Sequence, residues 1–209
     1  MSAEKSSRLS SDDRREQILD AATAVFGERG YVGGTTDAIA RAAGISQAYV
    51  VRMFGSKEDL FAEVCARAGQ RVAEAFRAAI AQFTPDSTVE DKLRLLGETY
   101  GYLIADRGTL LSLMHAFTQG ADPKFGPLGR DYFLNAFRIV RDEAGMGGAQ
   151  TTAFFAQGML INTLLAMRMP DVYDDTDADE LMKYAFGEKC DDLLTLVRSQ
   201  AIMADAVRA

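Results

Sequence analysis

Residues 35–57 read TTDAIARAAGISQAYVVRMFGSK, and this stretch decides the fold. Residues 36–43 have the spacing of a short helix. Gly44 ends this helix, because glycine readily adopts the left-handed backbone conformation that a tight turn needs. Ser46 is a good amino-terminal cap for a second short helix over residues 47–54. The stretch therefore predicts two short helices joined by a tight turn.

The second short helix has two chemically different faces. Ile45 is expected to fill the junction of the two helices, and Val50, Val51 and Phe54 to give an apolar inner stripe. The opposite face presents mainly polar and aromatic side chains: Gln47, Ala48, Tyr49, Arg52 and Met53. A helix that reads base edges in the major groove needs this division. Residues 35–54 therefore predict a DNA-binding helix-turn-helix.

Apolar residues follow helical spacing along almost the whole chain. Before the turn, a helix is expected to begin near Asp13, where Asp13 and Glu16 offer a capping box, and to end at Gly27 and Gly30. No alternating strand pattern is present. The sequence predicts an all-α fold of about nine helices, the later ones over about residues 57–83, 87–105, 108–119, 125–144, 149–169 and 176–206.

Charge is distributed unevenly along the 209 residues, whose formal net charge is −7. Residues 1–70 carry 9 basic and 10 acidic side chains, a net of −1, and residues 71–209 carry 14 and 20, a net of −6. Residues 38–57 hold three basic side chains and no acidic one. A local positive face can bind phosphates there despite the acidic remainder of the chain.

Composition argues against several classes of protein. With one histidine and two cysteines 125 positions apart (190 − 65), we expect neither a multi-histidine metal site nor a disulfide framework. In the acidic run 171–180, Glu180 stands where a calcium-binding loop needs glycine, so a solvated loop is expected. No nucleophile elbow, zinc-protease or P-loop motif occurs. We expect no metal, no cofactor and no enzyme activity.

The amino-terminal residues are polar, without the apolar core of a secretory signal. No apolar run approaches the roughly 18 residues of a membrane span. A cytoplasmic protein with no membrane partner is therefore expected.

The block from Arg15 to about Cys65 resembles the TetR family of transcriptional regulators in the order and spacing of its residues. One departure is the pair Val50-Val51, where the family usually has Leu-Tyr or Ile-Tyr. Tyr49 is the candidate to replace that tyrosine, either at a phosphate or at a base. The resemblance is carried by Ile18, Leu19, Ala21, Ala22, Phe26, Gly30, Tyr31, Thr35, Thr36, Ile39, Ala40, Ala43, Gly44, Ser46, Phe54, Ser56, Lys57, Glu58 and Leu60.

The resemblance implies a DNA-binding domain over residues 12–70 and an effector-binding and dimerisation domain over residues 71–209. Thr36 would cap the first short helix and contact phosphate. Lys57 would contact phosphate at the start of the long helix, where the helix dipole also favours an anion. Gln47 and Arg52 are candidates for base edges. The expected DNA-binding residues are Thr35, Thr36, Ser46, Gln47, Ala48, Tyr49, Arg52, Met53 and Lys57.

The resemblance also implies an effector pocket among the helices of the second domain. Its aromatic and methionine residues suit a hydrophobic or aromatic small molecule. The expected pocket residues are Tyr100, Leu103, Met114, His115, Phe117, Phe133, Phe137, Phe155, Met159 and Asn162. Apolar stripes on the last two helices suit a dimer interface of four helices. They comprise Ala153, Ala156, Leu160, Leu164, Met167, Leu181, Tyr184, Ala185, Leu193 and Leu196.

These features together predict a ligand-responsive transcriptional repressor. A homodimer would bind a palindromic operator in double-stranded DNA, and the effector would release it, with the long helix from Lys57 carrying the coupling. Two alternatives stay open: an adaptor that kept the fold without DNA binding, and an all-α enzyme that uses His115 with a carboxylate.

Overall fold

The computed structural model describes residues 10–172, 174–187 and 195. Within these ranges the chain forms nine α-helices and no strand, which confirms the predicted all-α fold. The helices are α1 (Ser11–Gly33), α2 (Thr36–Ala42), α3 (Gln47–Phe54), α4 (Lys57–Ile80), α5 (Val89–Ala105), α6 (Arg107–Thr118), α7 (Phe125–Arg138), α8 (Gly148–Ala166) and α9 (Thr176–Phe186). A π-helical turn, η1 (Ile139–Glu143), continues α7, and a 3-10 turn, η2 (Met169–Val172), follows α8.

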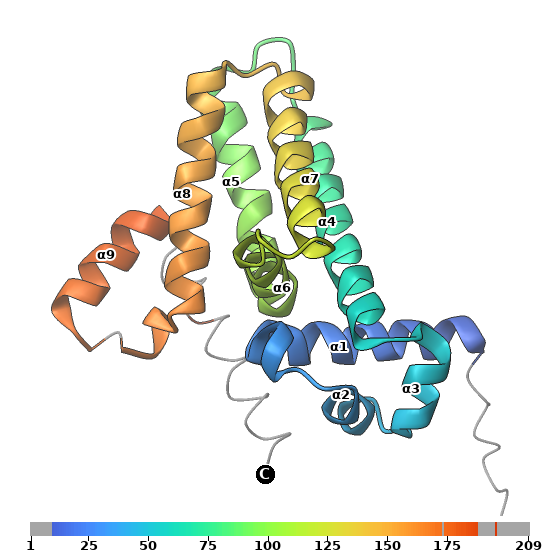
Figure 1. Ribbon diagram of the computed structural model, residues 1–209. Helices are drawn as coiled ribbons and strands as arrows, with labels where there is room; N and C mark the ends of the chain where they lie inside the picture. Colours follow the sequence, from blue (N-terminus) through green and yellow to red (C-terminus); the bar gives the residue numbers. More distant parts are fainter. Residues whose placement is uncertain (1–9, 173, 188–194, 196–209) are drawn as a thin grey trace, which may run out of the picture.

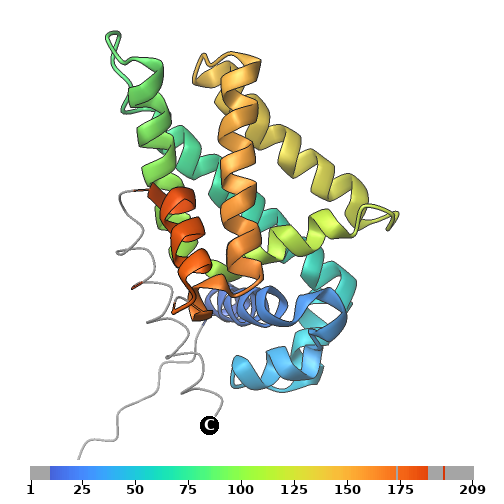
Figure 2. The ribbon, with the colours of Figure 1, turned by 90° about the vertical axis from the view of Figure 1, so that its left-hand side faces the viewer.

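The helices form a small base and a taller bundle (Figure 1). The base consists of α1, α2 and α3, and α4 rises from it. Beside α4 stand α5, α7 and α8, while the shorter α6 lies low in the bundle, next to α1 (Figures 1 and 2). The helix α9 packs on the outer side of α8. The predicted single helix over residues 176–206 is wrong in its length, because α9 ends at Phe186, where Gly187 takes a φ of +66°. The predicted part beyond Gly187 lies outside the described residues, apart from residue 195.

The first helix differs from the sequence prediction at both ends. Its capping box is formed by Ser10 and Asp13, because the Ser10 hydroxyl accepts from the Asp13 amide and the Asp13 carboxylate accepts from the Ser10 amide. The predicted end of this helix is correct at Gly30 and wrong at Gly27. Gly30 has a φ of +67° and a ψ of 177°, which are not helical values, so the regular helix stops there and a last turn runs on beyond the kink to Gly33.

Two groups of buried side chains form the core, and α4 contributes to both. Its first half adds Leu60, Phe61, Val64 and Cys65 to the core of α1, α2 and α3. Its second half, from Ala68 onward, adds to the core of the bundle. The change falls between Cys65 and Ala68, near the division at residue 70 that we propose for the two domains.

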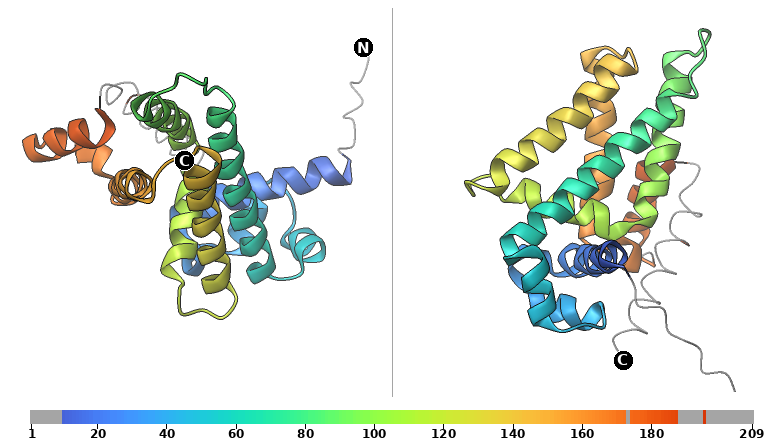
Figure 3. Two further views of the ribbon diagram at one scale, coloured as in Figure 1. Left: turned by 90° about the horizontal axis from the view of Figure 1, so that it is seen from above. Right: turned by 90° about the vertical axis from the view of Figure 1, so that its right-hand side faces the viewer.

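The base and the bundle meet most closely where α6 crosses α1, which runs beneath the bundle in the view from above (Figure 3). A methyl group added to Gly27 of α1 would lie 2.7 Å from the α-carbon of Gly108 of α6. Farther along α6, the His115 Nε2 lies 3.3 Å from the Gly27 carbonyl oxygen, and its ring packs against Gly30. The two helix backbones are therefore in direct contact.

Candidate DNA interface and ligand cavity

The helix-turn-helix is built as the sequence predicts, except for the position of Val51 and the cap of α2. Gly44 makes the turn with a φ of +64°, and the Ser46 hydroxyl accepts from the Tyr49 amide at the start of α3. Val50 and Phe54 are buried, at 0 % and 6 % exposure. Val51 is 44 % exposed, so its assignment to the inner stripe is wrong. It lies about 100° around the helix from Val50, toward the outer face.

The outer face of α3 is formed by exposed side chains with an aromatic flank. Gln47, Ala48 and Arg52 are exposed, whereas Tyr49 and Met53 are half-buried and pack against the core of the base. The guanidinium of Arg52 lies over the Tyr49 ring, 4.7 Å from its centroid. This contact holds Arg52 along the outer face rather than over the core.

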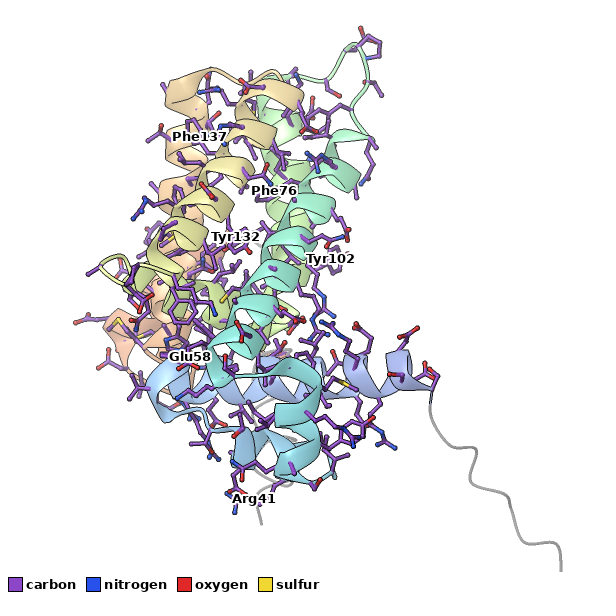
Figure 4. All side chains as sticks on the ribbon, turned by 45° about the vertical axis from the view of Figure 1, so that its right-hand side comes forward. Arg41, Glu58, Phe76, Tyr102, Tyr132 and Phe137 are labelled. Atoms are coloured by element: carbon purple, nitrogen blue, oxygen red, sulfur yellow. The ribbon has the colours of Figure 1, made fainter. Side chains whose placement is uncertain are left out.

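The two threonines act at the start of α2, and Lys57 contacts the end of α1. The Thr35 hydroxyl caps α2 by accepting from the Ala38 amide, so the assignment of this cap to Thr36 is wrong. Thr36 Oγ1 instead accepts from Gln47 Nε2 at 2.9 Å, which links α2 to the amino terminus of α3. Lys57 Nζ donates to the Val32 carbonyl at 3.3 Å. Figure 4 shows Arg41 of α2 at the bottom of the base, far from Phe137 at the top of the bundle.

A second set of contacts fixes the start of α4 to the end of α1. Tyr31 donates its hydroxyl hydrogen to Glu58 at 2.6 Å, and Lys57 Nζ lies 4.5 Å from the centroid of the Tyr31 ring. Burial, followed by this hydrogen bond, raises the pKa of Tyr31 to about 12, and the bond lowers the pKa of Glu58. Lys124 from the turn before α7 pairs with Asp59 at 2.6 Å. Residues of α1, α4 and α7 therefore meet at this corner, where Figure 4 marks Glu58.

A cavity opens among α4, α5, α6, α7 and α8. The space free of protein atoms measures about 610 Å³, which includes the part of the cavity that is open to solvent. Figure 4 labels Phe76 of α4 and Tyr132 of α7, which belong to its lining, and Tyr102, which is 77 % exposed and does not. The lining comprises Gly69, Val72, Phe76, Tyr100, Leu110, Leu113, Phe117, Tyr132, Phe133, Ala136, Phe154, Phe155, Gly158, Met159 and Asn162.

Six of the ten predicted pocket residues line this cavity: Tyr100, Phe117, Phe133, Phe155, Met159 and Asn162. Leu103, Met114, His115 and Phe137 do not. Leu103 packs into the bundle core, and His115 faces α1. At about 100° per residue, Met114 points to one side of the α6 face that Leu110, Leu113 and Phe117 form. The Phe137 ring lies behind Phe155 and beneath the Arg141 guanidinium.

The sequence prediction missed the α4 wall of the cavity, formed by Gly69, Val72 and Phe76. Their spacing of three and then four residues marks one helical face, which could have revealed them. The polar part of the lining is a hydrogen-bonded pair: the Tyr100 hydroxyl donates to Asn162 Oδ1 at 2.7 Å. Burial raises the pKa of Tyr100, so its phenol stays neutral at physiological pH.

The predicted dimer residues divide into three groups. Ala153, Ala156, Leu160, Met167, Leu181 and Tyr184 are exposed on α8 and α9. Leu164 and Ala185 are buried, and their assignment to a surface is wrong because they pack with Met182 between α8 and α9 of the same chain. Leu193 and Leu196 lie outside the described residues.

Neither a cluster of metal-ligating side chains nor a membrane-spanning helix is present in the described part of the chain. In residues 10–172 and 174–187, no three His, Cys, Asp or Glu side chains gather where they could hold a metal ion. The Asp175 carboxylate of the acidic run accepts from the Asp177 and Ala178 amides at the start of α9. No helix among the same residues is long and apolar enough to span a membrane.

The geometry defines a class of protein: an all-α chain with a helix-turn-helix at one end and an apolar cavity in the bundle above it. The sequence model of the family described as "Bacterial regulatory proteins, tetR family" matches residues 18–64. A solved TetR-like transcriptional regulator from a Rhodococcus species has the same fold, with a TM-score of 0.62 and 24 % identity over 93 % of this chain and 99 % of that one. Residues 18–64 therefore match the TetR family in sequence, and the chain has a TetR-like fold.

Two curated relatives each match part of the chain. The transcriptional activator FasR from Mycolicibacterium smegmatis is 37 % identical over 76 residues, which are 36 % of this chain and 35 % of FasR. The transcriptional regulator BetI from Rhizobium meliloti is 37 % identical over 83 residues, 39 % of this chain and 41 % of BetI. The matches therefore span about a third to two fifths of these relatives.

Proposed function

We propose that the protein is a ligand-responsive transcriptional regulator that binds a palindromic operator as a homodimer. The observation that carries this proposal is the recognition helix α3, whose Val50 and Phe54 anchor it while Ala48 and Arg52 stay exposed. Repression is the proposed direction of regulation. The match to the TetR family and the names of FasR and BetI support a regulator, and FasR is named an activator, so the experiment below measures DNA binding and its direction separately.

Five side chains of the base have a proposed role in DNA binding. Gln47 and Arg52 would contact base edges, because an amide and a guanidinium each make paired hydrogen bonds to purines. Thr36 and Lys57 would contact phosphates, for which Lys57 would exchange its bond to the Val32 carbonyl. Tyr49 would set the position of Arg52 through their ring contact.

The proposed dimer uses α8 and the exposed side of α9. Apolar residues lie on all sides of α8, so one face packs on the bundle and another, with Ala156, Leu160 and Met167, faces solvent. A helix that is apolar on its exposed side favours contact with a partner helix. Two chains joined there would present two recognition helices, as half-sites about one DNA turn apart require.

The proposed coupling between cavity and DNA runs through α6 as well as α4. Leu110, Leu113 and Phe117 on one side of α6 line the cavity, while Gly108 and His115 on the other side lie against α1. An occupant that moves α6 would therefore act directly on the base. In a population-shift mechanism, the effector binds better to the state whose recognition helices are wrongly spaced for DNA.

The proposal is tested by selecting bound DNA from a random pool and then measuring affinity for the selected site. We expect a palindrome, and a loss of about 1–3 kcal/mol for Arg52→Ala. Lys57→Ala should lower the salt dependence by about one phosphate contact. Arg94→Ala on α5 is the control. Like Arg52, Arg94 is exposed, and it forms ion pairs with Asp91 and Glu98 of its own helix.

A folded dimer that selects no DNA sequence would contradict the proposal and favour the adaptor. A reporter gene placed behind the selected site then gives the direction of regulation. A rise in expression when the regulator is removed would support repression.

A further inference from the structure

The cavity is lined by rings and carries no charge. Seven of its fifteen lining residues are Phe or Tyr, and none of these described residues is Asp, Glu, Lys, Arg or His. The rings meet edge to face, with centroids 5.5 Å apart for Phe117 and Phe133 and 5.3 Å for Phe133 and Phe155. Such walls favour an aromatic occupant. A charged one would lose its hydration without gaining a partner, so the lining selects against charge.

One polar group of the lining has hydrogen-bonding capacity to spare. Asn162 is 6 % exposed, and its Oδ1 accepts from the Tyr100 hydroxyl at 2.7 Å. Its amide nitrogen, Nδ2, makes no hydrogen bond within the described part of the chain. Asn162 belongs to the cavity lining, so this nitrogen is free to donate to a hydrogen-bond acceptor that enters the cavity.

The surroundings of this pair leave room for a ligand atom. Gly158 lies one turn before Asn162 on α8, and a methyl group placed there would lie 3.7 Å from the Tyr100 ring. With glycine at this position, the space beside the Tyr100 ring stays open. Phe76 stacks on that ring, with centroids 6.2 Å apart. The ring is thus held in place by Phe76, and the Tyr100 hydroxyl in turn orients the Asn162 amide.

We propose that the cavity takes an uncharged aromatic molecule with one hydrogen-bond acceptor, such as a ketone, ester or amide carbonyl, which receives a hydrogen bond from Asn162 Nδ2. Tyr100 is a positioning residue that fixes the amide. This inference rests on the proposed function only in taking the cavity as the effector site.

The selection against charge is tested with two fluorescent probes that share their rings. N-phenylnaphthylamine is neutral, and anilinonaphthalene sulfonate carries one negative charge. We expect the neutral probe to bind at least about tenfold more tightly to the full chain. Gly158→Leu, which fills the space beside Tyr100, should abolish this binding. Equal affinities, or neutral-probe binding unchanged by Gly158→Leu, would overturn the proposal.

The acceptor is tested by displacing the neutral probe with benzophenone or diphenylmethane, which differ by one carbonyl oxygen. The ketone should compete about tenfold better. The double variant Tyr100→Phe/Asn162→Leu removes both polar partners without stranding either, so the two competitors should become equal. Phe137→Leu, outside the lining, is the matched control and should keep the difference. A preference that survives in the double variant would refute the role of Asn162.

If the double variant does not fold, as judged by its thermal unfolding, the comparison is made with Asn162→Leu alone. Tyr100 then keeps its ring, and the ketone preference should still disappear.

Failure of this inference is distinguishable from failure of the proposed function. If the neutral ketone binds as expected but operator affinity does not change, the inference stands and the ligand response fails. If a charged aromatic molecule enters the cavity and releases DNA, while the neutral ketone does not, the ligand response stands and the inference is wrong.

Discussion

The base and the bundle each contain a cluster of aromatic rings, and the clusters are used differently. In the base, Phe61 contacts Phe26, Tyr31 and Phe125 with ring centroids 5.0 to 5.1 Å apart. The three phenylalanines are at most 2 % exposed. Phe125 belongs to α7, so the bundle inserts one of its own rings into the core of the base. This cluster fills its space and fastens the two regions together.

In the bundle, the rings stand around a space instead of filling it. Phe76, Phe154 and Phe155 are 5.7 to 6.4 Å apart, and all three line the cavity. Glycines make room at two points. At Gly69 a methyl group would lie 2.8 Å from the Tyr132 ring, and at Gly158 the space beside Tyr100 is free. The same residue type thus gives rigidity in the base and a binding space in the bundle, according to how closely the backbones approach.

The largest expected effect is a loss of stability, and it should differ between a ring of the base and a ring of the bundle. Phe61→Ala should lower the free energy of unfolding by about 3–5 kcal/mol, because a fully buried ring leaves a cavity. Phe155→Ala should cost about half of that or less, because its ring is half-buried and already borders free space. Urea unfolding at one fixed chain concentration measures both. Equal losses would mean that the bundle rings are packed as tightly as those of the base.

A smaller effect is expected at the joint of the two regions. In Gly27→Ala the new methyl group would lie 2.7 Å from the Gly108 α-carbon, so α1 and α6 must separate, at a cost of about 1–3 kcal/mol. Gly97→Ala is the matched control, because nothing lies within 4 Å of the new methyl group on α5. It should stabilise the chain by about 0.5–1 kcal/mol, since alanine favours helix. Thermal unfolding that moves both variants the same way would disprove the close contact.

Local chemistry made much of the fold predictable. The bounds of α3 follow from Ser46 and Gly55, which cap it at either end. The break in α1 at Gly30 also follows from local chemistry, because glycine readily adopts a positive φ. The interpretation of Gly27 as a helix end is wrong, because this glycine allows close approach to Gly108, a residue 81 positions away (108 − 27). A contact so distant in sequence leaves no trace in local spacing.

The candidate sites were predictable to a lesser degree, for a related reason. An apolar stripe shows that a helix face is buried, but it does not show against what. Leu164 and Ala185 have the spacing of an interface and are covered by their own chain. Phe76 was missed because the whole of α4 has the pattern of core, and only the fold shows which turn borders the cavity.

The smallest expected effect is a pH-dependent change in stability at one of two tyrosines. The Tyr31 hydroxyl donates a hydrogen bond to an ionisable carboxylate, whereas the Tyr100 hydroxyl donates to an amide. The bond lowers the pKa of Glu58 below its ordinary 4.5, so it stabilises the fold above that pH and the gain is lost as pH falls through the lowered value. The pKa of Tyr31 is raised from 10.0 to about 12. This group therefore stabilises the fold below pH 10, and the gain is lost as pH rises through about 12. Tyr31→Phe should therefore lower the melting temperature at neutral pH by a few degrees at most, and by less near pH 3. Tyr102→Phe, at a side chain that is 77 % exposed, should show no such pH dependence. A deficit in Tyr31→Phe that stays constant from neutral to acid pH would mean that the bond to Glu58 contributes nothing.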